Sequence, residues 1–185
     1  MPTDSFFKAH LNVLPFPYLS SESQLLTLVY FCFAGLDLLS DKNVFNSMPA
    51  DKCIDWIYSL QTPNGFKGFS SDSSDEPHSS HTTMTYVGLL SLLILNDDLS
   101  KVHTLAITNH VQKCQLVDGS FVPYVGSSES DLRFMFSAIA VLTILQDLKA
   151  INKEKAFEYI KSCKSYDGKS DVRFDIRRIW AETGT

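Results

Sequence analysis

The sequence predicts an all-α protein built from repeated helical hairpins. Two observations carry this prediction: an internal repeat of roughly 50 residues, and an alternation of amphipathic segments with almost wholly apolar ones. The chain has 185 residues, of which 44% are hydrophobic and 20% are charged. That composition is typical of an ordinary globular domain and not of a disordered chain.

The repeat appears when segments 57–65, 111–119 and 160–168 are placed in register, at offsets of 54 and then 49 residues. Apolar positions four and three residues apart coincide in all three segments, which places them on one face of a helix. Each segment ends in an Asn-Gly or Asp-Gly pair, which favours a left-handed residue and therefore predicts a helix stop. The coinciding positions are Cys53, Ile107 and Ala156, then Ile57, Val111 and Ile160, then Leu60, Cys114 and Cys163.

Three apolar segments, 23–39, 82–95 and 130–145, lie between these amphipathic helices. A helix that is apolar on nearly all sides must be buried on nearly all sides. The first unit begins with a helix over Asp4–Leu14, which Pro15 and Pro17 stop.

Two architectures fit such hairpins. A closed α-α toroid has the buried helices inside and the amphipathic helices outside. An open superhelical solenoid is the alternative, but its helices are commonly both half-exposed and its repeats span roughly 34–47 residues. The longer repeat and the nearly all-apolar helices favour a partial α-α toroid.

Charge and apolar run length exclude several functions. The net charge is −5 and the charged residues are scattered, so no basic patch is present to bind nucleic acid. The apolar runs fall short of the ~20 residues that span a bilayer, so we expect no transmembrane segment. The first residues lack a secretory signal pattern.

The four cysteines contain no CxxC pair. We therefore expect neither a disulfide framework nor a cysteine-rich zinc site. We expect free thiols in a cytoplasmic protein instead.

Two polar residues beside the apolar segments stand out. Arg133 is the one cation in segment 130–145, so its charge needs a partner. An ion pair with Glu129, four residues earlier, is one interpretation, and an anionic ligand in a cavity is the other. His81 precedes segment 82–95, where it suits a capping or surface role; with His78 alone it makes a weak metal site, because catalytic zinc needs three protein ligands.

The turn segments Leu60–Gly68 and Cys114–Phe121 resemble the Leu-Gln-x-x-x-Gly-x-Phe repeat of protein prenyltransferase β subunits. Segments 27–39, 56–61, 81–100 and 129–134 are similar to the type I geranylgeranyltransferase members of that family. The resemblance covers roughly residues 5–168 in one continuous order.

The resemblance implies an α-α toroid of about six hairpins, whose repeats bury their faces on one another. It implies transfer of a C20 isoprenoid from geranylgeranyl diphosphate to the cysteine of a C-terminal CaaX sequence. The family works as a heterodimer with a helical α subunit, and its catalytic zinc holds the substrate thiol as a thiolate.

For the isoprenoid, the resemblance implies three contacts. Thr27 leaves room at the base of the cavity, where a bulky aromatic residue would shorten it toward a farnesyl group. Tyr86 and Phe136 line the channel through dispersion and area burial. The alternatives are a threonine that bonds back to its own helix and aromatic residues that belong to the core.

For the CaaX peptide, the resemblance implies a water-bridged site for the terminal carboxylate made by His81, Glu129 and Arg133. Thr83 and Phe134 would neighbour the last residue of the peptide. We expect Arg133 to wait at the rim of an apolar cavity for this anion.

The chain departs from the family pattern in its C-terminal part. The family's zinc ligands, an Asp-x-Cys pair and a later histidine, and its diphosphate-binding basic cluster have no counterpart here. We therefore expect no catalytic and no metal-binding residue in this chain. Residues 1–168 would form the N-terminal half of a toroid and 169–185 a divergent tail. This form would be inactive alone; the alternative is a non-catalytic helical module that pairs with the α subunit.

Overall fold

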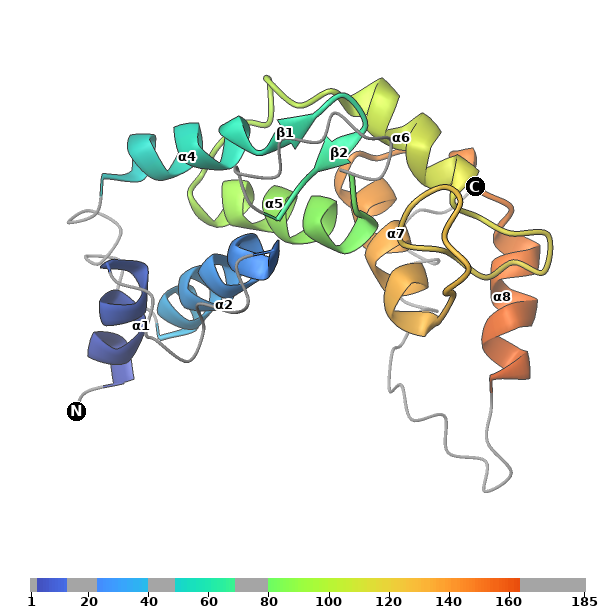
Figure 1. The fold of residues 1–185 in the computed structure, drawn as a ribbon, viewed down its shortest axis with the longest axis horizontal. Coiled ribbons are helices and arrows are strands. Elements are labelled where there is room, and N and C mark those ends of the chain that lie inside the picture. The colour runs from blue at the N-terminus through green and yellow to red at the C-terminus, as the bar shows by residue number, and fades with distance from the viewer. Residues whose placement is uncertain (1–2, 13–22, 40–48, 69–79, 164–185) are drawn as a thin grey trace.

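The computed structural model describes residues 3–12, 23–39, 49–68 and 80–163, and most of these residues are helical (Figure 1). The predicted all-α class is confirmed, with one short antiparallel hairpin added. The tail beyond residue 163, and with it the predicted boundary at 168, lies outside the described residues. The elements are α1 Thr3–Asn12, α2 Leu25–Leu38, α4 Ala50–Ser59, β1 Gln61–Thr62, β2 Gly65–Phe66, α5 Thr82–Ile94, α6 Thr104–Lys113, α7 Leu132–Ile144, the 3-10 helix Leu148–Ala150 and α8 Lys153–Ser162.

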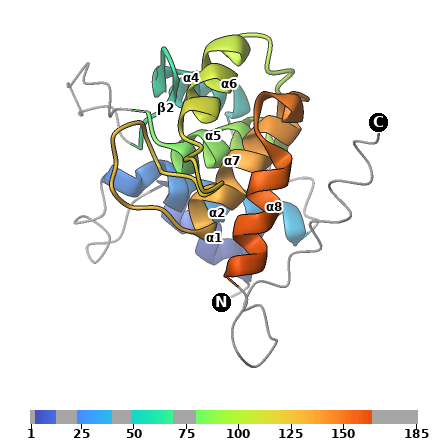
Figure 2. The ribbon, with the colours of Figure 1, turned by 90° about the vertical axis from the view of Figure 1, so that its right-hand side faces the viewer.

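The helices form two layers. Helices α2, α5 and α7 lie in one row, with α5 packed against both neighbours, and α1 packs on α2. Helices α4 and α6 run along the other side of this row, at the top of Figure 1. Helix α8 stands at the α7 end, where it faces the viewer in Figure 2. The predicted alternation of inner apolar and outer amphipathic helices is therefore observed.

Burial of the inner helices is less uniform than predicted. Helices α5 and α7 each bury seven residues of thirteen, whereas α2 buries only four of fourteen. Phe31 and Leu38 of α2 are 58% and 82% exposed. All-round burial is thus wrong for α2, because it lies at the end of the row and packs mainly on α1 and α5 in the described part of the chain.

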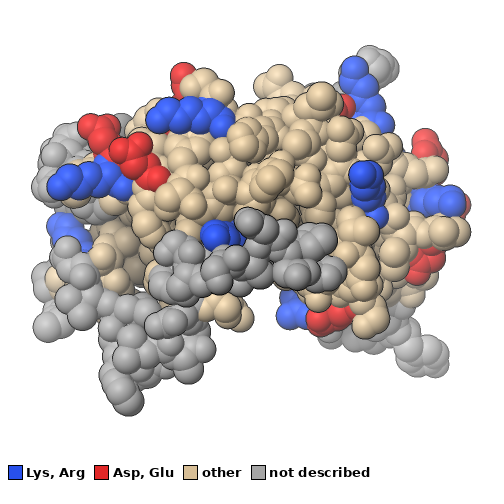
Figure 3. Space-filling model, turned by 45° about the horizontal axis from the view of Figure 1, so that its top comes forward, with Lys and Arg blue, Asp and Glu red and all other residues tan. Residues whose placement is uncertain are grey.

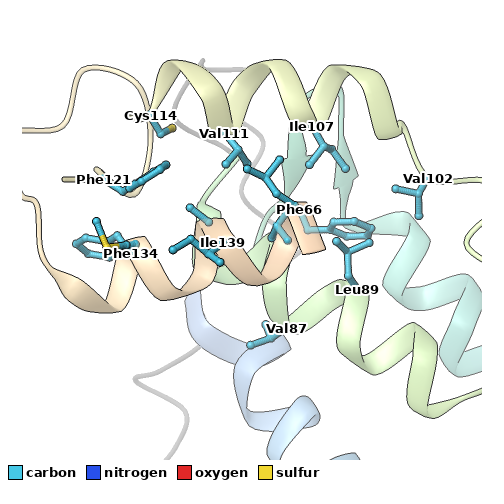
Figure 4. Close-up of a cluster of buried hydrophobic side chains, with 14 of the residues drawn as sticks. Phe66, Val87, Leu89, Val102, Ile107, Val111, Cys114, Phe121, Phe134 and Ile139 are labelled. Atoms are coloured by element: carbon cyan, nitrogen blue, oxygen red, sulfur yellow. The ribbon is translucent and has the colours of Figure 1, made fainter. Parts of the chain in front are cut away.

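Each of the two repeated turn segments contributes a buried phenylalanine to the core between the layers. Phe66 pairs with Gln61 in the hairpin, and Phe121 pairs with Gln115 in an isolated bridge. Both phenylalanines are fully buried, and Figure 4 shows Phe66 beside Leu89 beneath α6. The two turns differ by one residue in length, yet each places its phenylalanine at the same position in the fold.

Each turn glutamine also fixes the start of the next outer segment. The Gln61 amide donates to the carbonyl of Lys101 and accepts from the N–H of His103, both at 3.0 Å. The Gln115 amide makes the same two bonds to the carbonyl and N–H of Asn152, both at 2.8 Å. The glutamine of the repeat therefore has a structural role in both turns.

The turn glycines do not stop the helices as predicted, since α4 and α6 end several residues earlier. Gly119 does have a left-handed φ of 90°, and a Cβ there would lie 2.2 Å from the carbonyl oxygen of Lys155. Gly65 is not left-handed; it is needed for space, because a Cβ would lie 2.4 Å from Oγ1 of Thr85.

Left-handed residues instead end the inner helices. Asn96 and Gln146 follow α5 and α7 with φ of 61° and 57°. They are 50 positions apart, so this helix stop also belongs to the repeat.

The surface agrees with the expectations from composition. On the face shown in Figure 3, basic and acidic side chains are scattered around a broad uncharged area. No helix in the described ranges is long and apolar enough to cross a membrane. The four cysteines are free, as predicted. Cys163, the C-cap of α8, is exposed, whereas its repeat partner Cys114 is buried.

Candidate functional site

Most of the predicted site residues lie along the row of inner helices. The first, Thr27 on α2, points across to α5, where its hydroxyl lies 3.4 Å from Sδ of Met84. The alternative interpretation, a bond back to its own helix, is therefore wrong. Thr27 is half-buried and places a small side chain between these two inner helices.

An aromatic series crosses all three inner helices. The ring of Tyr30 on α2 lies 6.3 Å from that of Tyr86 on α5, and Tyr86 lies 5.2 Å from Phe136 on α7 in an edge-on contact. All three are half-buried. Burial, followed by the effect of Tyr30, raises the pKa of Tyr86 to about 12. The phenol of Tyr86 is therefore neutral at physiological pH, and the three rings form a continuous aromatic series.

A second set of contacts joins the starts of α5 and α7. The hydroxyls of Thr83 and Ser137 lie 3.3 Å apart, and the ring of His81 lies 5.8 Å from that of Phe134. Phe134 is only 8% exposed. In this chain it is part of the core, which was the alternative interpretation for the aromatic residues.

His81 is the N-cap of α5, so the predicted capping role is confirmed. Its Nδ1 accepts a hydrogen bond of 3.1 Å from the N–H of Thr83. Because Nδ1 is an acceptor, the neutral ring carries its proton on Nε2 and can donate it to an anion or a water. Burial lowers the pKa of His81 and so favours this neutral form. His78 lies outside the described residues.

Arg133 does not face a cavity, so that expectation is wrong for this chain. Its side chain is 77% exposed and pairs with two carboxylates. One is Glu129, whose Oε1 lies 3.6 Å from Nη2, as the ion-pair interpretation predicted. The closer one is Asp131, whose Oδ2 accepts from both Nε and Nη2. The Arg133 side chain, in the first turn of α7, is therefore in contact with solvent.

Asp131 was missed by the sequence reasoning. It is the N-cap of α7, where Oδ1 accepts from the N–H groups of Arg133 at 2.7 Å and Phe134 at 3.3 Å. Partial burial alone would raise its pKa, but the bonds from Arg133 and Phe134 hold the pKa of Asp131 below its ordinary value. The signal was present in the sequence as an aspartate directly before an apolar run.

The predicted carboxylate trio is only partly assembled. Glu129 and Arg133 form an ion pair. The described contacts connect His81 to Arg133 through the ring of Phe134, which lies 5.6 Å from Cζ of Arg133. The arrangement offers a cation and a neutral N–H donor at the starts of α7 and α5, the helices that carry Phe136 and Tyr86, which suits a ligand with an apolar body and an anionic end.

Among the residues that the structure describes, no group of three or more His, Cys, Asp or Glu is placed to hold a metal ion. Burial raises the pKa values of Cys32, Cys53 and Cys114, in the last case to about 11. These thiols are poor thiolate ligands or nucleophiles at neutral pH.

The other residues that the sequence reasoning missed are Tyr30, Met84 and Ser137. Each contacts a predicted residue from a neighbouring inner helix. Tyr30 could have been found from its position one helical turn after Thr27. Met84 and Ser137 carry no such signal, because only the packing of α2, α5 and α7 identifies the face on which they lie.

Inner apolar helices backed by outer amphipathic helices, and joined by a repeated Gln–Phe turn, define a segment of an α-α toroid. The chain belongs to the prenyltransferase family, since the family model described as "Prenyltransferase alpha-alpha toroid domain" matches residues 3–169.

Two curated relatives are similar over most of the chain. The geranylgeranyl transferase type-1 subunit beta of Dictyostelium discoideum is 37% identical over 190 aligned residues, which cover 88% of this chain and 54% of the relative. The protein of the same name from Arabidopsis thaliana is 32% identical over 176 residues, covering 85% of this chain and 46% of the relative. The chain therefore spans about half the length of these relatives.

A solved structure supports the fold. The Candida albicans protein geranylgeranyltransferase-I complexed with GGPP matches with a TM-score of 0.77 and 21% identity, over 89% of this chain and 51% of that chain. The predicted partial toroid is thus confirmed, in preference to an open solenoid.

Proposed function

We propose that this chain is part of the β subunit of a type I protein geranylgeranyltransferase. That enzyme would be cytoplasmic and would attach a C20 isoprenoid from geranylgeranyl diphosphate to the cysteine of C-terminal CaaX sequences. The observation that carries the proposal is the aromatic row from Tyr30 through Tyr86 to Phe136, with the small residue Thr27 at its α2 end. The names of the two curated relatives support the same activity.

The row suits a long isoprenoid for physical reasons. A polyene gains most from dispersion and area burial against ring faces and edges, which three aromatic side chains on neighbouring helices provide. The phenol of Tyr86 is neutral, and all three rings are half-buried between the inner helices. Thr27 is a small residue in contact with Met84, and the last isoprene unit would lie beside these two side chains.

The peptide carboxylate would bind near the starts of α5 and α7. There the Nε2–H of His81 and the guanidinium of Arg133 would donate to the carboxylate through a bridging water, and Glu129 would orient the cation. Thr83 and Phe134 would lie beside the last residue of the peptide. Arg133 is exposed in this chain and is therefore accessible to such a ligand.

Zinc belongs to the proposed activity, since it would hold the substrate thiol as a thiolate. The residues described here do not gather a metal site, so we assign none of them to zinc. A helical α subunit is the proposed partner. The zinc ion and the α subunit would complete the enzyme, and this chain would supply the aromatic residues that contact the isoprenoid and the residues that bind the peptide carboxylate.

The test is a change of isoprenoid length. Thr27→Trp in the full-length protein, purified with the α subunit, should place a bulky ring beside Met84 and exclude the fourth isoprene unit. We expect the ratio of kcat/KM for geranylgeranyl diphosphate to that for farnesyl diphosphate to fall by about tenfold or more. Thr27→Ser, which keeps a small hydroxyl side chain, should leave the ratio unchanged. An unchanged ratio in a Thr27→Trp protein that still folds would refute the assignment.

A further inference from the structure

We propose that Asp131 is a positioning residue that holds the guanidinium of Arg133 ready for the carboxylate of the peptide. This inference rests on the proposed function and deepens it, because it names the group that orients the anion-binding side chain. Three observations carry it: the two separate tasks of the Asp131 carboxylate, the edge of the guanidinium that it occupies, and the exposure of Arg133.

The two oxygens of Asp131 hold the backbone and the side chain of the same residue. Oδ1 accepts from the N–H of Arg133 at 2.7 Å and caps the helix. Oδ2 accepts from Nε of Arg133 at 2.8 Å and also from Nη2. The guanidinium is thereby tied to the first turn of α7 by a rigid carboxylate only two residues away.

The bonds leave one part of the guanidinium available. Nε and Nη2 form one edge, and Asp131 occupies it. Nη1 takes no part in these bonds, so it can donate to a water or an anion. Glu129 lies 3.6 Å from Nη2, at the distance of an ion pair. The geometry therefore favours a single or water-bridged contact over a bidentate one.

The exposure of Arg133 explains why positioning matters. A long side chain that is 77% exposed would adopt many rotamers if nothing held it, and binding a ligand would then cost the entropy of fixing one of them. Asp131 has already fixed the guanidinium in the free protein. Preorganisation of this kind improves affinity without adding a contact to the ligand.

The test is Asp131→Asn. Asparagine keeps an oxygen that can cap the N–H groups of Arg133 and Phe134, but its second group is an amide that donates and cannot accept from the guanidinium. The full-length protein with the α subunit is assayed with one CaaX peptide in two forms, with a free carboxylate and with a carboxamide. We expect KM for the carboxylate form to rise about tenfold, with kcat and the KM of the carboxamide form unchanged.

Two further variants make the test specific. Adding Asp131→Asn to Arg133→Ala should have no further effect, because the group to be positioned is gone. Asp98→Asn is the matched control: it removes one negative charge from a carboxylate that accepts from a backbone N–H two residues on, in the loop after α5. An equal rise in KM for both peptide forms, or a full additional loss in the Arg133→Ala background, would show that Asp131 is only structural.

A second measurement separates this inference from the proposed function. If the parent enzyme transfers no geranylgeranyl group, the proposed function fails, and the hold on Arg133 is judged by the hydrogen exchange of its Nε–H in the chain alone. Exchange that speeds up about tenfold in Asp131→Asn supports the hold. Unchanged exchange would overturn it.

Discussion

At the scale of single residues, the charged and polar groups differ most from what the sequence predicts. The identity of His81 as a cap follows from its place before an apolar run, and the structure agrees. The direction of Arg133 does not follow from the sequence, because a charge beside an apolar helix can turn either inward to a ligand or outward to an acid. The nearby Asp131 decides between them, and its two-residue spacing is not a standard ion-pair signal.

Histidine burial predicts a pH dependence of stability. Burial lowers the pKa of His81, and burial with nearby Lys113 lowers that of His110. In the unfolded chain both titrate near the ordinary value of about 6.5, so the unfolded state takes up protons first as pH falls. Stability should be full above that value and should decrease as pH falls through it.

The variant His81→Asn tests the share of this effect that belongs to the cap. Asparagine caps a helix but does not titrate, so the loss of thermal stability between about pH 7.5 and about pH 5.5 should become smaller. The dependence that is left would come from His110. His103→Asn, at the exposed start of α6, is the control for loss of an imidazole. A loss as large in His81→Asn as in the parent would contradict the account.

At the scale of helices and turns, most of the fold could be predicted from the sequence. Within the described ranges, the repeat places each outer helix, and the apolar segments place each inner helix within a few residues of its observed bounds. The sequence could not predict which interactions require each residue of the turns. Gly65 is required by a side chain from another element, and the two glutamines bind backbone about 40 residues away.

The pair of hydrogen bonds that a turn glutamine makes to the backbone before the next outer helix, called here the glutamine clamp, gives a prediction about stability. Gln115→Ala removes two hydrogen bonds to the backbone of Asn152 and should lower the free energy of unfolding by about 1–2 kcal/mol, measured by urea denaturation. Gln115→Glu keeps the acceptor and loses the donor, so its cost should be about half as large.

The matched control for the clamp is Gln112→Ala on the same outer helix. The exposed Gln112 side chain makes no hydrogen bond within the described ranges, so its removal should change stability by less than about 0.5 kcal/mol. Equal effects of Gln112→Ala and Gln115→Ala would show that the clamp contributes nothing to stability.

At the scale of the whole molecule, the chain is a row of inner helices with one face backed by outer helices and the ends less covered. The exposed Phe31 and Leu38 lie at one end, and the exposed Cys163 at the other. The sequence could predict the family from its repeat and motifs. That prediction did not depend on the direction in which the Arg133 side chain points. It could not predict which inner residues touch, because contacts such as that between Thr27 and Met84 depend on helix packing.

In the proposed enzyme, the isoprenoid lies along the inner helices. The direct measurement uses a photoreactive C20 diphosphate, bound to the full-length protein with the α subunit, irradiated, and mapped by mass spectrometry of the labelled peptides. The account predicts that the label is found on α2, α5 and α7 and is lost when excess geranylgeranyl diphosphate is added. Label confined to α4, α6 and α8, or label that the excess diphosphate does not displace, would contradict it.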